Sequence, residues 1–282
     1  MRFLVLLLFI LATLKSYSQQ VDFYLTPSIS NEILEKNGGY IKAFLEKETG
    51  VSINLIIPPD YDTVVEAFGK PNPCFAIMSS LSYVHANKKH QAMVKLRTVR
   101  YGRAVYQGMI VVNANSKIKT LADLNGKAIV YTDALSTSGY LYPKSMIQKA
   151  NVTIGKEIFA KKHDEVIRLV YEGKADAGAA FYSPPSSKGE IHDARDRLRA
   201  KHPDVEKKVV ILATTDPIPN DPIVFSKQFD SETARKLYTA LVKFSTDAKG
   251  KQVLLDLYGT EGFTKASDTD YDSLRKLLAS IK

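Results

Sequence analysis

The sequence predicts an α/β protein built on mostly parallel sheets. Short β-like runs alternate with helix-like stretches along the whole chain, beginning with residues 21–25 and 33–45. Residues 51–57 and 75–78 are further apolar runs, and a helix-like stretch follows each of them. The sequence has no internal repeat and no long linker. If the chain forms two lobes, we therefore expect chain crossovers between them.

Glycine and short polar residues mark where the expected helices begin and end. Gly50 should end the first helix, because glycine adopts the left-handed backbone that often follows a helix. Asp60 should cap the next helix, because its side chain can accept from a free backbone N–H. The later elements are expected as a strand at 75–78, a helix from 79, a strand at 109–112, a helical turn at 120–125, a strand at 128–131, a helix at 136–150, a strand at 158–159, a helix at 163–171, strands at 177–181 and 208–213, and a mostly helical tail over 231–282.

Residues 1–18 have the features of a secretory signal peptide. Arg2 supplies a positive start, residues 3–14 form an apolar run, and small serine side chains precede the expected cut after residue 18. The run is too short for a membrane anchor, which needs about 20 apolar residues. Gln19 follows the cut, where a lipoprotein would carry a cysteine. We therefore expect a soluble, periplasmic mature chain without a lipid anchor.

The charge pattern favours small anions over nucleic acid. The formal net charge is +9, but Lys and Arg are interleaved with acids, as in residues 42–48, and no basic run alternates with aromatic residues. Cys74 is the only cysteine, so the chain cannot form an internal disulfide. The five histidines do not cluster with Cys or Asp at metal-ligand spacing. We expect no nucleic-acid partner, no metal and no cofactor.

One stretch, residues 133–140, predicts a seat for a tetrahedral oxyanion. After a strand ends, Ser136, Thr137 and Ser138 place three consecutive hydroxyl groups where a helix begins. A helix start has about four backbone N–H groups without partners and roughly half a positive charge, and Gly139 would let an anion approach the backbone. The alternative is an ordinary helix cap followed by two solvated hydroxyl groups.

Eight short motifs together resemble those of a known family. In the family's order, and over nearly the whole mature chain, they are Pro59-Asp60-Tyr61, Leu81-Ser82-Tyr83-Val84, residues 106–112, 118–127 and 136–140, His163-Asp164, and residues 175–179 and 218–222. They resemble the phosphate-, phosphite- and phosphonate-binding proteins of ABC importers, the phosphonate-binding group of the type II periplasmic binding proteins. Each motif alone is weak, whereas eight in order are specific.

The resemblance implies a two-lobed, Venus-flytrap architecture. Each lobe would be a mostly parallel sheet flanked by helices, and crossover hinge strands near residues 111–112 and 219–224 would join the lobes. Residues 19–112 together with residues 222–282 would form the first lobe, and residues 113–221 the second. A small solute would be held between the two.

The resemblance also implies which groups would bind that solute. Ser136, Thr137 and Ser138 resemble the hydroxyl and backbone donors to the ligand's oxygens, and His163 would donate to another oxygen. Asp221 would accept a P–OH proton or an amine, and would reject fully ionised, sulfate-like anions. Judged from the residues alone, a lone histidine is more often a surface or core residue, and an aspartate between two prolines could merely shape a turn.

Five further residues are expected around the ligand. The hydroxyl groups of Tyr61 and Tyr106 would reach it from the opposite lobe, although each ring could instead pack on its own helix or strand. Tyr83, Tyr182 and Ser183 are expected in the pocket wall.

One departure from the family bears on the choice of ligand. Members that take aminoalkyl phosphonates place a carboxylate seven residues after the aspartate that corresponds to Asp176, to hold the amine. This chain has Ser183 at that place. We therefore expect phosphite, phosphate or a small alkyl phosphonate, and not 2-aminoethylphosphonate, to be the best ligand.

The sequence thus predicts a periplasmic solute-binding protein, not an enzyme, that passes a small phosphorus oxyanion to an ABC permease in the inner membrane. It gives no sign of a dimer interface, so we expect a monomer. A sensory protein that delivers the same ligand to a membrane receptor is the alternative, because both would present closed lobes. An enzyme on the same fold is a weaker alternative, since no Gly-x-Ser-x-Gly elbow appears.

Overall fold

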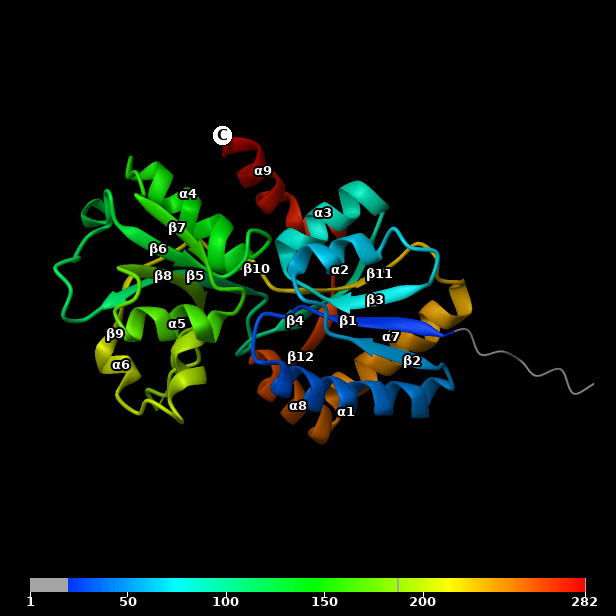
Figure 1. The fold of residues 1–282 in the computed structure, drawn as a ribbon. Helices are drawn as coiled ribbons and strands as arrows, with labels where there is room; N and C mark the ends of the chain where they lie inside the picture. Colours follow the sequence, from blue (N-terminus) through cyan, green and yellow to red (C-terminus); the bar gives the residue numbers. More distant parts are fainter. Residues whose placement is uncertain (1–19, 187, 282) are drawn as a thin grey trace, which may run out of the picture.

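The chain folds into two α/β lobes that lie side by side in the computed structural model (Figure 1). The structure describes residues 20–186 and 188–281, so the expected signal peptide, residues 1–18, lies outside the described residues. Within that described part, no helix is both long enough and apolar enough to cross a bilayer. Each lobe is a sheet with helices on both faces.

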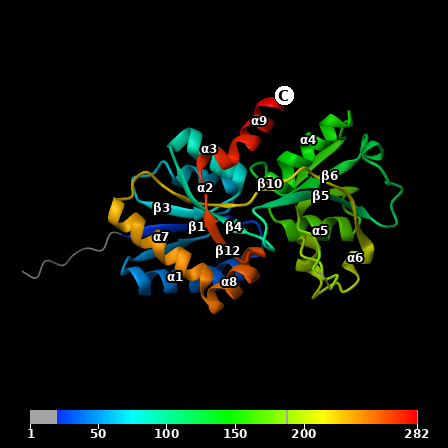
Figure 2. The same ribbon diagram turned by 180° about the vertical axis from the view of Figure 1, so that it is seen from behind.

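The first lobe combines the beginning and the end of the described chain (Figures 1 and 2). Its strands lie in the order β12 (Gly262–Lys265), β4 (Met93–Val99), β11 (Pro222–Phe225), β3 (Cys74–Ile77), β1 (Val21–Leu25) and β2 (Ile53–Ile56). One face packs against α1 (Asn31–Thr49), α7 (Ser231–Thr246) and α8 (Ala248–Tyr258). The other face packs against α2 (Tyr61–Ala67), α3 (Ser80–His90) and α9 (Asp272–Ser280), which follows a short turn, η4 (Asp268–Tyr271).

The second lobe is built from the middle of the chain. Its strands lie in the order β10 (Ile218–Pro219), β5 (Val105–Asn113), β8 (Ala177–Tyr182), β6 (Ala128–Tyr131) and β7 (Lys156–Phe159), and β9 (Val209–Thr214) also pairs with β5. One face packs against α5 (His163–Tyr171), η3 (Ala194–Leu198) and α6 (Val205–Lys208). The other face packs against η1 (Leu121–Leu124) and α4 (Tyr142–Lys149), which continues a π-helical turn, η2 (Thr137–Leu141).

The residues expected to begin and end helices occupy those positions in the structure. Gly50 follows α1 with a left-handed backbone, φ 71°, and its N–H donates to the carbonyl of Glu46. Asp60 caps α2, because its carboxylate accepts from the backbone N–H of Thr63 at 2.8 Å. Both predictions are confirmed.

Both sheets are mixed, whereas the sequence predicted mostly parallel ones. Parallel pairing is confined to β2–β1–β3 in the first lobe and β7–β6–β8 in the second. The strands next to the connections between lobes, β4, β5, β10 and β11, pair antiparallel with their neighbours. Parallel neighbours are joined by a strand–helix–strand connection. A strand that begins directly after a crossover from the other lobe lacks this connection, so it can pair antiparallel.

Two short crossovers lie side by side and join the lobes. Residues 100–104 link β4 to β5, and residues 220–221 link β10 to β11. Asn220 ties the crossovers together, since its side-chain N–H groups donate to the carbonyls of Thr98 and Arg103, both at 2.8 Å. The chain therefore passes twice through one hinge.

The first hinge lies earlier in the chain than the sequence predicted. β5 contains residues 111–112 and pairs wholly within the second sheet, so the chain changes lobes at residues 100–104 and not after residue 112. The other expected boundary, after residue 221, coincides with the start of β11. An apolar strand has the same sequence pattern in either lobe, so its residues could not show which sheet it joins.

The C-terminal helix α9 lies over the seam between the lobes (Figures 1 and 2). Leu274 of α9 is fully buried in an apolar cluster that also contains Tyr83 of α3, in the first lobe, and Tyr142 of α4, in the second. Apolar packing therefore connects the lobes on this side of the hinge.

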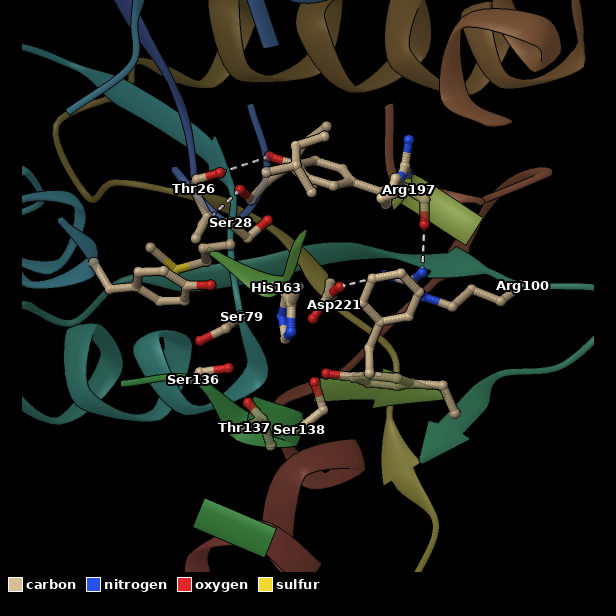
Figure 3. Close-up of a pocket in the computed structure, with 17 residues that line it drawn as sticks. Thr26, Ser28, Ser79, Arg100, Ser136, Thr137, Ser138, His163, Arg197 and Asp221 are labelled. Carbon is tan, nitrogen blue, oxygen red and sulfur yellow. Dashed lines mark hydrogen bonds and ion pairs between the residues drawn. The ribbon is translucent and has the colours of Figure 1, made fainter. Parts of the chain in front are cut away.

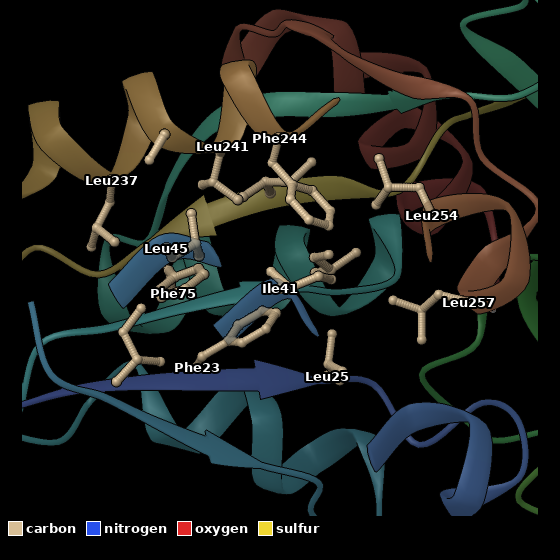
Figure 4. Close-up of a cluster of buried hydrophobic side chains, with 14 of the residues drawn as sticks. Phe23, Leu25, Ile41, Leu45, Phe75, Leu237, Leu241, Phe244, Leu254 and Leu257 are labelled. Carbon is tan, nitrogen blue, oxygen red and sulfur yellow. The ribbon is translucent and has the colours of Figure 1, made fainter. Parts of the chain in front are cut away.

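Aromatic stacking organises the core of the first lobe (Figure 4). Phe23 on β1 and Phe75 on β3 stack with their ring centroids 4.5 Å apart and an interplanar angle of 7°. Both rings are fully buried beneath α1 and α7, where Ile41 and Leu241 contribute to the same cluster.

We expect Phe75→Ala to lower the free energy of unfolding by about 3–5 kcal/mol, because the substitution leaves a cavity between the sheet and the helices α1 and α7. Urea denaturation followed by circular dichroism measures the change. Tyr40→Ala is the control, since Tyr40 is 45% exposed and should cost less than about 1 kcal/mol. Equal losses in both variants would contradict the assignment of Phe75 to the core.

Candidate functional site

A small cavity lies between the lobes, next to the carboxyl ends of strands from both sheets (Figure 3). Such crevices are where open α/β sheets bind ligands. The centres of water-sized molecules can occupy about 40 Å³ of it, so the cavity suits a small solute. It is lined by Thr26, Ser28, Ile29, Tyr61, Ile77, Met78, Ser79, Arg100, Tyr106, Ser136, Thr137, Ser138, His163, Phe181, Arg197, Asp221 and Tyr258.

The second lobe contributes a row of hydroxyl groups where β6 leads into η2. Ser136 caps this turn, because its hydroxyl oxygen accepts from the N–H of Gly139 at 3.1 Å. Ser136, Thr137 and Ser138 are at most 2% exposed, and all three line the cavity. The first N–H groups of a helical turn have no acceptor within it, so this start presents donors and positive potential to the cavity.

The first lobe places a second helix start directly opposite. Ser79 caps α3 by accepting from the N–H of Ser82 at 3.0 Å, and its own hydroxyl donates to the carbonyl of Leu135 at 2.7 Å in the second lobe. The N–H of Leu81 donates to the hydroxyl oxygen of Thr137 at 2.9 Å. That hydroxyl oxygen accepts from α3, so its proton remains to be donated.

His163 is held in place by contacts on both sides. Its Nδ1 lies 3.1 Å from the hydroxyl oxygen of Thr132, and its backbone N–H donates to the carbonyl of Ser28, in the first lobe, at 3.0 Å. Burial, together with the positive charges of Arg100 and Arg197, lowers the pKa of His163 to about 3. The imidazole is therefore neutral at pH 7, with Nδ1 engaged within its own lobe.

An ion pair between the two crossovers forms part of the cavity wall. Arg100 follows β4 and Asp221 precedes β11, and the guanidinium Nη2 lies 2.7 Å from the carboxylate Oδ2. Arg100 also donates to the carbonyl of Tyr258 at the end of α8. Burial raises the pKa of Asp221, whereas Arg100 opposes that rise. We refer to Arg100 and Asp221 as the hinge pair.

Three phenol groups complete the polar lining. Tyr61, Tyr106 and Tyr258 are all buried, and burial is the main cause that raises the pKa of each phenol. Their hydroxyl groups therefore stay protonated at neutral pH and can donate hydrogen bonds. Tyr258 already donates to the carbonyl of Thr26 at 3.1 Å.

The cavity is thus lined by neutral donors, helix starts and two guanidinium groups, one of which is paired with Asp221, and this is the chemistry of an anion site. A family model described as "ABC transporter, phosphonate, periplasmic substrate-binding protein" matches residues 23–271. The chain belongs to this family. The family consists of periplasmic solute-binding proteins of ABC transporters and not of enzymes.

Two relatives bear names that fit this family. The phosphonates-binding periplasmic protein of Escherichia coli (strain K12) is 27% identical over 238 residues, which are 83% of this chain and 68% of that protein. The phosphate-import protein PhnD of Mycolicibacterium smegmatis is 29% identical over 183 residues, which are 60% of this chain and 57% of that protein. The second match therefore spans less than two thirds of the relative's length.

Two solved structures have the same two-lobed fold. A binding protein component of an ABC phosphonate transporter from Pseudomonas aeruginosa superimposes with a TM-score of 0.80, 20% identity, and coverage of 93% of this chain and 86% of that one. PhnD1 from Prochlorococcus marinus, in complex with methylphosphonate, gives a TM-score of 0.76, 20% identity, and coverage of 94% and 100%. This binding protein therefore has the fold of the type II periplasmic binding proteins.

The cavity brings together all seven residues that the sequence singled out as ligand contacts. They are Tyr61, Tyr106, Ser136, Thr137, Ser138, His163 and Asp221. Tyr106 does not come from the lobe opposite the hydroxyl row, however, because β5 begins after the first crossover and belongs to the second sheet. The binding role of each residue stays a prediction.

The three residues expected in the pocket wall do not line the cavity. Tyr83 points toward the C-terminal segment, where its hydroxyl donates to Asp268 and its ring packs on Tyr271 with centroids 4.9 Å apart. Tyr182 packs on the α5 side of the second sheet, and Ser183 is buried beyond the end of β8. Phe181 lines the cavity in their place.

Sequence reasoning missed several residues of the lining, above all Arg100, Arg197, Ser79 and Tyr258. Ser79 carried a usable signal, because it lies between a buried strand and a helix start, as Ser136 does. The two arginines carried none, since basic residues are common along the whole chain. Within residues 20–186 and 188–281, no three His, Cys, Asp or Glu side chains are grouped to hold a metal ion.

Two glycines let the hydroxyl row pack against its neighbours. A Cβ at Gly139 would lie 2.2 Å from the hydroxyl oxygen of Thr132, so this glycine serves close packing. The sequence predicted a different role for it, the approach of an anion. A Cβ at Gly108, on β5, would lie 2.6 Å from the backbone carbonyl oxygen of Ser138. The backbone of η2 therefore rests directly on β5.

We expect Gly108→Ala to displace the hydroxyl row, because a backbone carbonyl cannot turn aside as a flexible side chain can. Overpacking of this kind costs about 1–3 kcal/mol of folding stability, which should appear as a lower melting temperature. Gly39→Ala is the matched control, since a Cβ there meets no atom within 4 Å. A wild-type melting temperature in Gly108→Ala, measured by scanning calorimetry, would contradict the close contact.

Proposed function

We propose that this protein captures a small phosphorus oxyanion (phosphite, phosphate or a small alkyl phosphonate) by closure of its lobes and, as a monomer, delivers it to an ABC permease in the inner membrane. The observation that carries the proposal is the row of buried hydroxyl groups at the start of η2, which faces the start of α3 across a small cavity. Amide and hydroxyl donors at two helix starts suit a tetrahedral anion.

Bonds between the lobes support the closure. Leu81 to Thr137 and His163 to Ser28 join the lobes at the cavity itself. At its rim, Arg197 of η3 donates to the carbonyls of Asp256 and Leu257, at 3.0 and 3.1 Å, at the end of α8. A ligand held by both lobes stabilises the closed form by its differential affinity, and a permease that recognises this form receives only loaded protein.

The lining supports a ligand without an amino group. Asp221 is the one carboxylate among the described residues that line the cavity, and Arg100 already occupies it. Phe181 offers an apolar wall for a hydrogen or a small alkyl group on phosphorus. An ammonium group would therefore be buried without a free acidic partner, which is unfavourable.

A panel of anions tests the proposal on the mature chain. At about 100 times Kd, a ligand adds about 2.7 kcal/mol to the free energy of unfolding, which raises the melting temperature of a chain of this size by about 5 °C or more. We expect such shifts with phosphite, phosphate or methylphosphonate, and smaller ones with 2-aminoethylphosphonate and an alkyl sulfonate. No shift with any phosphorus oxyanion, or the largest shift with a sulfonate, would overturn the proposal.

Thr137 allows a sharper test of the hydroxyl row. Thr137→Val keeps the shape of the side chain but removes the hydroxyl that accepts from Leu81 and can donate to the anion. A hydrogen bond to a charged group contributes about 1.5–3 kcal/mol, so Kd for phosphite should rise about 10- to 150-fold. Thr137→Ser keeps the hydroxyl and should stay within about threefold of wild type, by titration calorimetry. Equal affinities in the two variants would exclude this role.

A further inference from the structure

The hinge pair lies in a part of the site that has a fixed geometry. Arg100 is 6% exposed, and its guanidinium carbon lies 5.0 Å from the ring centroid of Tyr106 and 5.8 Å from that of Phe181. Asp221 lies on the neighbouring crossover, and its backbone carbonyl accepts from the N–H of Thr98 at 3.0 Å. Contacts with both crossovers thus set the positions of the two charges relative to the cavity.

One nitrogen of Arg100 has no partner in the described part of the chain. Its Nη2 binds Asp221 and its Nη1 binds the carbonyl of Tyr258. The remaining nitrogen, Nε, is buried and has no hydrogen-bond partner among the described residues. A buried guanidinium N–H without an acceptor is costly, so the site has an unused cationic donor beside the cavity.

The charge of Arg100 changes which protonation state of the ligand Asp221 can favour. A lone buried carboxylate beside an anion favours a ligand that keeps a proton, since two like charges cannot both be ionised at short range without a large cost. With Arg100 at 2.7 Å the two charges cancel, and the guanidinium of Arg197 and the helix starts leave the cavity with positive potential. The site then has no need for a P–OH group.

We propose that Arg100 is a specificity-determining residue, which neutralises Asp221 so that the site takes its phosphorus oxyanion doubly ionised. This inference rests on the proposed function and narrows its substrate class to dianions of phosphite, phosphate or alkylphosphonate. It also predicts that amino groups are rejected, because the guanidinium pairs with the carboxylate that an ammonium would need and repels the ammonium.

Few other groups near the hinge pair titrate between pH 5.5 and 8.5. The pKa of His163 is lowered to about 3, and burial keeps the nearby phenols protonated. The other charged and titratable groups that face the pair are Arg197, His163, Tyr61, Tyr101, Tyr106, Tyr258 and Tyr271, with Asp133 acting on Tyr61 from the second lobe. The second ionisation of the ligand is therefore the main protonation change that can alter binding between pH 5.5 and 8.5.

Calorimetric titration with phosphite across this pH range tests the inference. For wild type, Kd should rise about tenfold for each pH unit below the second pKa of phosphite, because the dianion fraction falls by that factor. Arg100→Gln leaves Asp221 unpaired, so the slope should vanish or reverse as the monoanion becomes the preferred form. Asp221→Asn breaks the same contact but leaves the positive charge, and should keep the wild-type slope.

The variants separate charge from structure. A wild-type slope in Arg100→Gln, or equal loss of slope in Arg100→Gln and Asp221→Asn, overturns the inference. If Arg100→Gln does not fold, Arg100→Lys replaces it, and loss of slope in this charge-conserving variant also overturns the inference. If wild type binds phosphite with an affinity independent of pH, the role of Arg100 fails while the proposed function stands. If wild type binds no phosphorus oxyanion, the proposed function itself fails.

Discussion

Backbone N–H groups at helix starts, which have no acceptor within their own helix, are the constraint on which the rest of this structure depends. The first turn of any helix has donors that no intrahelical acceptor satisfies, and in an α/β fold these starts follow the carboxyl ends of parallel strands. Here η2 and α5 of the second lobe and α2 and α3 of the first begin at the same cavity. The partial positive charge of these helix starts therefore gathers at the seam between the lobes, which is where a bound anion would be favoured.

The same hydroxyl groups serve the helix starts and the contact between lobes. Ser79 caps α3 and also donates across the seam, while Thr137 accepts from α3 and still has a proton to donate. A solute bound by these groups would therefore act on the atoms that join the lobes. This sharing of atoms gives a physical basis for coupling between capture and closure in the proposed function.

The hinge adds a second link between site and architecture. Arg100 and Asp221 lie on different crossovers, and Asn220 bonds those crossovers to each other, so the charge balance of the cavity is set where the chain changes lobes. A buried ion pair is weak evidence for stability, because its desolvation cost offsets its attraction. The position of the hinge pair beside the cavity suggests that its role is to select the ligand.

The sequence by itself determined the α/β class, the ends of individual helices and the hydroxyl row, because each of these depends on residues within a few positions of one another, as at Gly50 and Asp60. Only the tertiary structure decided that β5 joins the second sheet, that Tyr83 points toward the C-terminal segment, and that Arg100 meets Asp221 across 121 positions of sequence. Those outcomes follow from long-range packing and from the hinge, where contacts between distant segments override local pattern.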